Sequence, residues 1–112
     1  KAARGPDGRV YPWGNVFDWT FTFGAGSAPE QPQEPRVAGS TPFDESPYGV
    51  RDMAGNVMEW IDEAMPGVQI WGVRGGSFAL DTPSGFRSTN RKRSSPARQQ
   101  NMGFRVVAEP LQ

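Results

Sequence analysis

The chain has 112 residues and no formal net charge at neutral pH, and its length is that of one domain or of part of one. Because it contains no cysteine and no histidine, these residues hold no disulfide, no thiol nucleophile, no imidazole acid–base group and none of the usual zinc sites. No apolar run approaches the ~20 residues that a membrane-spanning helix needs, so we expect no membrane partner. The 7 Phe, 4 Trp and 2 Tyr residues supply most of the core material, and 14 Gly with 11 Pro predict a loop-rich fold with short strands.

The first residues, Lys1 to Gly5, are typical of the last turn of a helix that ends at a glycine. A domain does not normally begin at the end of a helix. We therefore expect these residues to belong to the C-terminal part of a domain, with the N-terminal part of the same domain or chain as a packing partner.

Four aromatic residues alternate with polar ones at Phe17, Trp19, Phe21 and Phe23. Period-two alternation is typical of a strand with one buried face, so we expect a half-buried strand here. The same ladder could form a platform on which a sugar or a base stacks, but burial in the core is the more frequent fate of such residues. Residues 24–42, rich in proline and glycine, predict a surface loop.

The segment 52–61 carries acidic side chains next to a tight turn that contains glycine. A strand after this turn places Glu59 on one face between two apolar residues. Such an acid is either bound to a metal or paired with an arginine of a neighbouring strand, Arg74 or Arg105. Asp52, Glu59 and the turn carbonyls offer the oxygen ligands that calcium prefers, although arginine pairing is the more frequent arrangement.

Two further strands are expected at residues 70–74 and 104–107, with a shorter one at 86–90 between them. Gly75 and Gly76 indicate a bulge or a close approach of two backbone segments. Six of the twelve basic residues lie between residues 82 and 108, where no acid occurs. Three arginines are expected to be buried among these strands: Arg74, Arg87 and Arg105. A buried arginine needs carboxylate or carbonyl partners.

The order of the short motifs resembles the formylglycine-generating enzyme family, the sulfatase-modifying factors, over nearly the whole chain. The motifs are Tyr11-Pro12-Trp13-Gly14, Ser46-Pro47-Tyr48-Gly49-Val50, the segment from Asp52 to Trp60, Arg74-Gly75-Gly76-Ser77-Phe78, Arg87-Ser88 with Arg91, and Gly103-Phe104-Arg105-Val106-Val107. The resemblance implies an α+β, C-type-lectin-like fold that is loop-rich, with short antiparallel strands late in the chain. It also implies a longer family domain, of which residues 1–112 are the C-terminal part.

The oxidases of that family use two cysteines that bind copper, and the resemblance places these at Leu80 and Gly85. Without thiolates there is no soft ligand for Cu(I) and no thiol to exchange with a cysteine of a client sulfatase. We therefore expect no copper and no catalytic residue in this chain, and the family's reaction does not carry over.

One calcium site of the family carries over onto these residues. The resemblance assigns it to the side chains of Asp52 and Glu59 and to the carbonyls of Gly55 and Val57, which makes calcium as favoured as arginine pairing. The family's other calcium site follows the Pro-Trp-Gly motif, where this chain is shortened and altered, and we assign no ligands there.

The favoured hypothesis for function is a ligand-binding, protein-binding or regulatory module without redox chemistry, whose protein or small-molecule ligand is unidentified. Its binding surface is expected on the loops of residues 79–101. The side chains we expect to contact a ligand are Phe86, Asn90, Lys92, Arg93, Arg98 and Gln99.

Three alternatives stay open. The segment 78–101 fits the frame of the variable ligand-binding proteins of diversity-generating retroelements. The chain could also belong to a formylglycine-generating or sulfoxide-synthase-like enzyme whose catalytic groups lie outside this segment. Nucleic-acid binding through the basic segment is the weakest hypothesis, because the net charge is zero and no known reading motif occurs.

Overall fold

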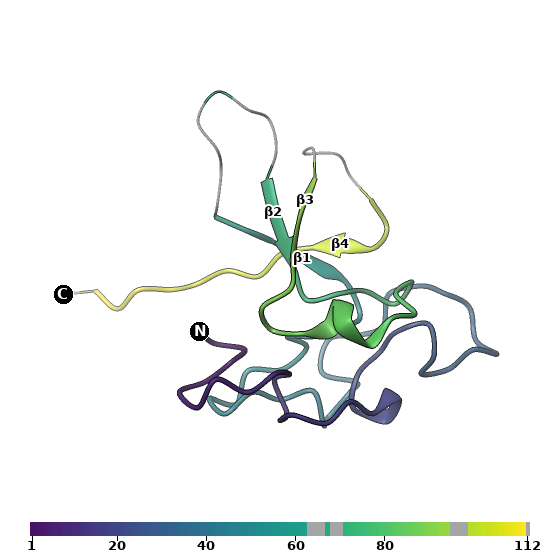
Figure 1. The fold of residues 1–112 in the computed structure, drawn as a ribbon. Coiled ribbons are helices and arrows are strands. Elements are labelled where there is room, and N and C mark those ends of the chain that lie inside the picture. The colour runs from purple at the N-terminus through teal and green to yellow at the C-terminus, as the bar shows by residue number, and fades with distance from the viewer. Residues whose placement is uncertain (63–66, 68–70, 95–98, 112) are drawn as a thin grey trace.

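The structure, a computed structural model, describes residues 1–62, 67, 71–94 and 99–111. Its elements are the 3-10 helices η1 (Trp19–Phe21) and η2 (Pro83–Phe86) and the strands β1 (Met58–Ile61), β2 (Trp71–Arg74), β3 (Arg91–Ser94) and β4 (Met102–Gly103). The first half of the chain forms a layer of loops and turns below the sheet, and η2 lies between the two (Figure 1). Within the described residues, no helix has the length and apolar character needed to cross a bilayer.

The four strands form one sheet in the order β3-β2-β1-β4. The pairs β1–β2 and β2–β3 are antiparallel, as expected, whereas β4 runs parallel to β1. The last strand was predicted at residues 104–107 and lies earlier, at Met102–Gly103. No described strand pairs with residues 104–107, and the side chains of Phe104 and Val107 are 76% and 89% exposed. In Figure 1 this C-terminal segment runs away from the sheet.

The strand predicted over residues 17–23 is absent, and η1 takes its place. The carboxylate of Asp18 explains the difference, because its Oδ1 accepts hydrogen bonds from the N–H and the hydroxyl of Thr20, at 2.8 Å and 2.7 Å. A capping acid of this kind favours a helical turn over a strand ladder. Thr22 and Phe23 are both buried, which strand alternation would not allow.

The aromatic residues converge on a core cluster instead of lining one strand face. The rings of Phe17 and Trp19 meet edge to face at 4.9 Å, and both contact Phe86, at 5.6 Å and 5.8 Å. Phe86 is 1% exposed. The short strand predicted at 86–90 is therefore wrong: Pro83 starts η2, whose last residue Phe86 is buried, and residues 87–90 form a turn.

The expected close approach of backbone segments is confirmed at Gly75, whose carbonyl accepts from the N–H of Gly55 at 2.6 Å. Two further glycines, Gly76 and Gly55, have no room for a side chain. A Cβ atom on Gly76, which has φ +71°, would lie 2.9 Å from the ring of Phe86. A Cβ atom on Gly55, with φ +83°, would lie 2.7 Å from the carbonyl oxygen of Phe23. Larger residues do not fit at either position, so these glycines allow the loop layer to pack directly against the strands and η2.

Candidate functional site

Leu80 and Gly85, the positions at which the resemblance places two cysteines, are in contact at the centre of the candidate site. Gly85 is buried, and a Cβ atom on it would lie only 2.3 Å from Cδ2 of Leu80. The isobutyl group of Leu80 therefore fills the space that a side chain at residue 85 would take. The positions are close enough for two short side chains to meet, but neither carries sulfur here.

Hydrogen bonds hold the loop that carries Leu80. Its N–H donates to the carbonyl of Ser77 at 3.1 Å, and its carbonyl accepts from the N–H of Ala25 at 2.9 Å. Further along the loop, Nδ2 of Asn90 donates to the carbonyl of Gly85 at 3.0 Å. These bonds fix both ends of the Leu80–Gly85 contact.

A pocket of about 160 Å³ lies beside this contact. Met58, Val73 and Leu80 contribute apolar walls, and Lys92 is the basic residue of β3 among its lining residues. The sheet register sets Lys92 opposite Val73, and directly opposed residues share a face of the sheet. Lys92 is exposed, and the structure records no ion pair between it and any described residue. Arg74 of β2 is also among the lining residues, so the pocket combines apolar walls with two basic side chains.

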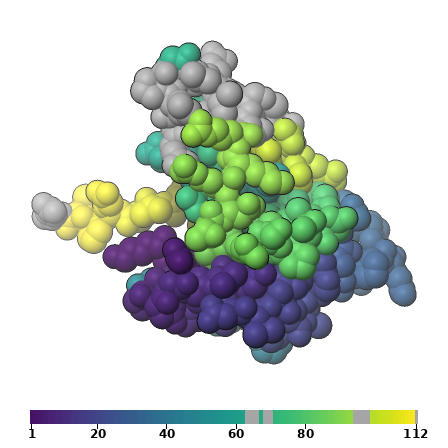
Figure 2. All heavy atoms as spheres, viewed as in Figure 1, coloured from purple at the N-terminus to yellow at the C-terminus, as the bar shows by residue number. Residues whose placement is uncertain are grey.

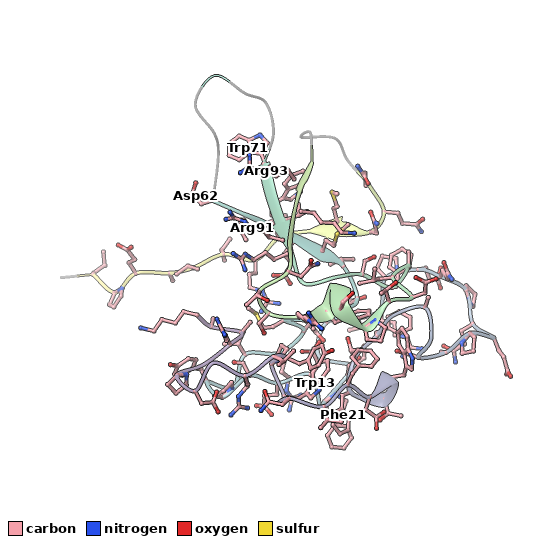
Figure 3. The ribbon with its side chains drawn as sticks, in the orientation of Figure 1. Trp13, Phe21, Asp62, Trp71, Arg91 and Arg93 are labelled. Carbon is pink, nitrogen blue, oxygen red and sulfur yellow. The ribbon has the colours of Figure 1, made fainter. Side chains whose placement is uncertain are left out.

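Two residues of the predicted binding surface, Asn90 and Lys92, line this pocket. Arg93 follows Lys92 on β3 and is exposed on the opposite face of the sheet, because neighbours along a strand point to opposite sides. Figure 3 shows Arg91 and Arg93 projecting from the sheet, far from Trp13 and Phe21 of the loop layer.

The other predicted surface residues do not contribute to the pocket. Phe86 was expected to contact a ligand but is a core residue, because its ring packs against Phe17 and Trp19. Gln99 is exposed, and its carbonyl accepts from the N–H of Met102 at 3.2 Å. Arg98 lies outside the described residues.

Two lining residues, Met58 and Asn101, were missed from the sequence. The parallel pairing of β1 with β4 brings them together, and the N–H of Met58 donates to the carbonyl of Asn101 at 2.8 Å. No spacing in the sequence signals this contact, because it depends on a long-range pairing. Ser77, a third lining residue, belongs to the Arg-Gly-Gly-Ser-Phe motif, and that motif was the available signal.

Glu59, the principal carboxylate of the predicted calcium site, is paired with Arg105. Nε of Arg105 donates to Oε2 at 2.5 Å, and Nη2 donates to Oε1 at 2.6 Å. The same guanidinium donates to the carbonyls of Arg51 and Asp52, at 3.0 Å and 2.9 Å. The hydrogen bonds that Arg105 donates to Glu59 raise the pKa of Arg105 above its usual value. Of the two predicted arrangements of Glu59, metal binding and arginine pairing, the structure contains the pairing with Arg105.

The second predicted calcium carboxylate, Asp52, accepts from the N–H of Gly39 at 2.6 Å. Beside it lies Asp44, which is 1% exposed and whose Oδ1 has no hydrogen-bond partner among the described residues. Burial raises the pKa of Asp44 to about 8, even though a hydrogen bond from the N–H of Ala54 acts in the opposite direction. Asp44 is therefore largely protonated at neutral pH.

Carboxylate and carbonyl oxygens around Arg105 make a donor set that a hard cation could also use. Calcium would compete with the Arg105 guanidinium for Glu59, because the guanidinium engages both carboxylate oxygens. Among the described residues, no three acidic side chains gather as a metal site, although the predicted site needs only two and relies on backbone carbonyls. Calcium at Asp52, Gly55, Val57 and Glu59 thus stays a prediction.

Residues 1–110 match the Sulfatase-modifying factor enzyme 1-like domain of the FGE-sulfatase family. The chain belongs to this family. Two relatives carry the name Inactive C-alpha-formylglycine-generating enzyme 2, from Mus musculus and Bos taurus, and each is 34% identical over 125 residues. The match covers 96% of this chain but only 39% and 40% of these relatives.

Solved structures of the same fold confirm the α+β, FGE-like architecture. PvdO from Pseudomonas aeruginosa superposes with a TM-score of 0.74 at 23% identity, covering 92% of this chain and 46% of PvdO. Treponema denticola variable protein 1 superposes with a TM-score of 0.68 at 20% identity, covering 92% of this chain and 41% of that protein. The FGE-sulfatase chain described here therefore spans less than half the length of these proteins.

Proposed function

We propose that this FGE-sulfatase domain is a non-oxidase binding module, which holds an apolar group of a protein or small-molecule ligand in the pocket beside Leu80. The contact between Leu80 and Gly85 carries the proposal. At the positions where the family resemblance places copper-binding cysteines, the chain has a leucine packed over a glycine. The word "Inactive" in the names of the 34% identical relatives agrees with a family branch without the oxidase reaction.

The pocket suggests which ligand chemistry to test. A volume of about 160 Å³ is that of a cavity which admits a group about as large as benzene, so it suits one side chain and not an extended ligand. Met58, Val73 and Leu80 favour an aliphatic group. Lys92 favours a nearby carboxylate, because a cation with an apolar neighbour recognises an apolar group that also carries a negative charge.

The test uses N-acetylleucine as a probe and N-acetylleucinamide as its uncharged match. In a two-dimensional NMR titration, both should shift the backbone amide signals of Leu80, Asn90 and Asn101. We expect Lys92→Gln to weaken the binding of N-acetylleucine about two- to fivefold, which is the scale of a partly exposed ion pair. The binding of N-acetylleucinamide should not change. Unchanged signals at all three residues with both probes would contradict the proposal.

A variable ligand-binding protein of a diversity-generating retroelement is the second candidate. The likeness in fold to Treponema denticola variable protein 1 supports it, at the level of the fold alone. In that case the varied residues would lie in segment 78–101, on the loops that hold the pocket. The check is genomic: a reverse transcriptase gene and a near-copy of this coding segment should lie beside the gene, and their absence removes this candidate.

A further inference from the structure

A second hollow, a groove of about 640 Å³, involves the face of the sheet opposite Lys92. Its walls come from the N-terminal segment with Arg4, strand β2 with Arg74 and residues 88–91, together with Met53 and Ile61. The N-terminal segment and the residues around 80–93 lie against each other on the face seen in Figure 2. A hydrogen bond from the N–H of Ser88 to the carbonyl of Val10, at 2.8 Å, joins the two parts.

The groove is basic. Among the described residues, its lining includes Lys1, Arg4, Arg74 and Arg91 and no acidic residue. A smaller adjoining hollow adds Arg87 and one acid, Glu59, whose carboxylate is taken by Arg105. Although the net charge of the chain is zero, the described residues along this groove therefore carry a local excess of positive charge.

Arg74 is the strongest single indication that an anion belongs here. The sheet register sets it opposite Glu59 on one side and opposite Arg91 on the other. Because Arg105 binds Glu59, the guanidinium of Arg74 donates instead to the carbonyl of Ser88 at 3.0 Å. The structure records no carboxylate partner for Arg74 among the described residues. A half-buried cation is normally countered by a negative charge, and a bound ligand can supply it.

The shape of the groove favours a peptide over a single small anion. Its volume exceeds that of the pocket by several times, and Met53 and Ile61 contribute apolar surface between the basic side chains. We propose that this groove binds an acidic peptide segment, with its carboxylates paired to Arg74 and Arg4 and an apolar side chain against Met53 and Ile61. Planar guanidinium groups pair with carboxylates through two parallel hydrogen bonds, which suits arginine over lysine at such a site.

Arg74 lines both this groove and the pocket beside Leu80, but β3 provides a matched pair of variants that tells the two sites apart. Arg91 and Lys92 are adjacent basic residues on one strand, with side chains on opposite faces of the sheet. The experiment measures the fluorescence anisotropy of a labelled peptide of sequence Glu-Glu-Leu-Glu-Glu. We expect Arg91→Gln to weaken binding about threefold or more, the scale of one ion pair, and Lys92→Gln to have little effect. Arg91 also contacts other parts of this chain, so Arg4→Gln serves as a second groove variant with the same expected loss.

Three results would overturn the proposal. Equal losses from Arg91→Gln and Lys92→Gln would mean unspecific attraction by total charge. Undiminished binding of a Gln-Gln-Leu-Gln-Gln peptide would remove the role of the carboxylates. Displacement of the peptide by inorganic phosphate at the same concentration of negative charge would assign the groove to small anions. Melting temperatures of all variants must match the parent protein for the comparison to count, and Arg4, exposed at the surface, is the variant most certain to meet that condition.

Discussion

At residue 85 a side chain has no room, because Leu80 already fills the neighbouring space. Gly85→Ala should therefore cost about 1 to 3 kcal/mol of unfolding free energy, as overpacked substitutions do. In a Leu80→Ala background the same substitution should cost less than about 0.5 kcal/mol, because the obstacle is gone. Urea unfolding of the four proteins gives the coupling energy directly. Additive effects would show that Leu80 and Gly85 do not compete for one space.

Asp44 makes the stability of this domain depend on pH. Its folded pKa of about 8 lies above the ordinary value of 3.8, so between these limits the folded state holds a proton that the unfolded state releases. The contribution is therefore complete below about pH 4 and is lost as the pH rises toward about 8, at up to about 1.4 kcal/mol per pH unit.

Asp44→Asn should remove this slope, because an amide does not titrate. Unfolding free energies measured between about pH 5 and pH 7 test the expectation, since that window lies between the two pKa values. Asp7→Asn is the matched control: the hydrogen bond from Arg9 lowers the pKa of Asp7 to about 2, so Asp7 stays ionised over this window. Equal slopes for the parent protein and Asp44→Asn would contradict the account.

At the scale of elements, Arg105 fastens the exposed C-terminal segment to β1 and to the turn before it. Arg105→Gln should lower the unfolding free energy by about 1 to 2 kcal/mol. This is the low end of what hydrogen bonds to charged groups contribute, because the Arg105 side chain is 36% exposed and partly screened by solvent. Arg87→Gln, at an exposed residue of the same charge, should change stability by less than about 0.5 kcal/mol. Equal effects would mean that the Arg105–Glu59 pair contributes nothing particular.

The same variant separates calcium from arginine at Glu59. If calcium binds the parent protein, millimolar calcium raises its melting temperature relative to EDTA, since a ligand of the native state stabilises it, and Glu59→Gln abolishes the difference. If the arginine pair excludes calcium, the parent protein shows no difference and Arg105→Gln gains one. No calcium effect in any of the three proteins removes the predicted site.

Sequence patterns predicted some elements well and others badly, for identifiable reasons. The strands at β1 and β2 and the close backbone approach at Gly75 followed from local residue preferences, and the structure confirms them. The strand over residues 17–23 failed because the cap formed by Asp18 outweighs the period-two alternation. Phe86 was misplaced on the surface because nothing local shows that its ring closes a cluster built from Phe17 and Trp19.

The candidate site was only partly accessible from the sequence. Asn90 and Lys92 were expected there, and the position of the site followed from the resemblance that placed Leu80 and Gly85 in the family's cysteine positions. Met58 and Asn101 complete the pocket only because β4 pairs in parallel with β1. Pairings between segments far apart in the chain carry no local pattern, so composition and periodicity could not supply them.

At the scale of the whole molecule, the sheet separates two surfaces of different chemistry. The side of Lys92 faces the pocket with its apolar walls, and the side of Arg91 faces the basic groove. A scaffold of the FGE-sulfatase family can keep its fold while its surfaces change, since fold and function are separable. Whether this chain can bind copper as the oxidases of the family do therefore depends on the residues at positions 80 and 85.

A Cu(I) titration in competition with a chelator tests that point most directly. Leucine and glycine provide no soft ligand, so the parent protein should take up no tightly bound Cu(I). Leu80→Cys/Gly85→Cys should take up one equivalent, because the two positions are in contact, whereas Leu80→Cys alone should not. One tightly bound Cu(I) in the parent protein would contradict the loss of the copper site, and none in the double variant would contradict its placement at Leu80 and Gly85.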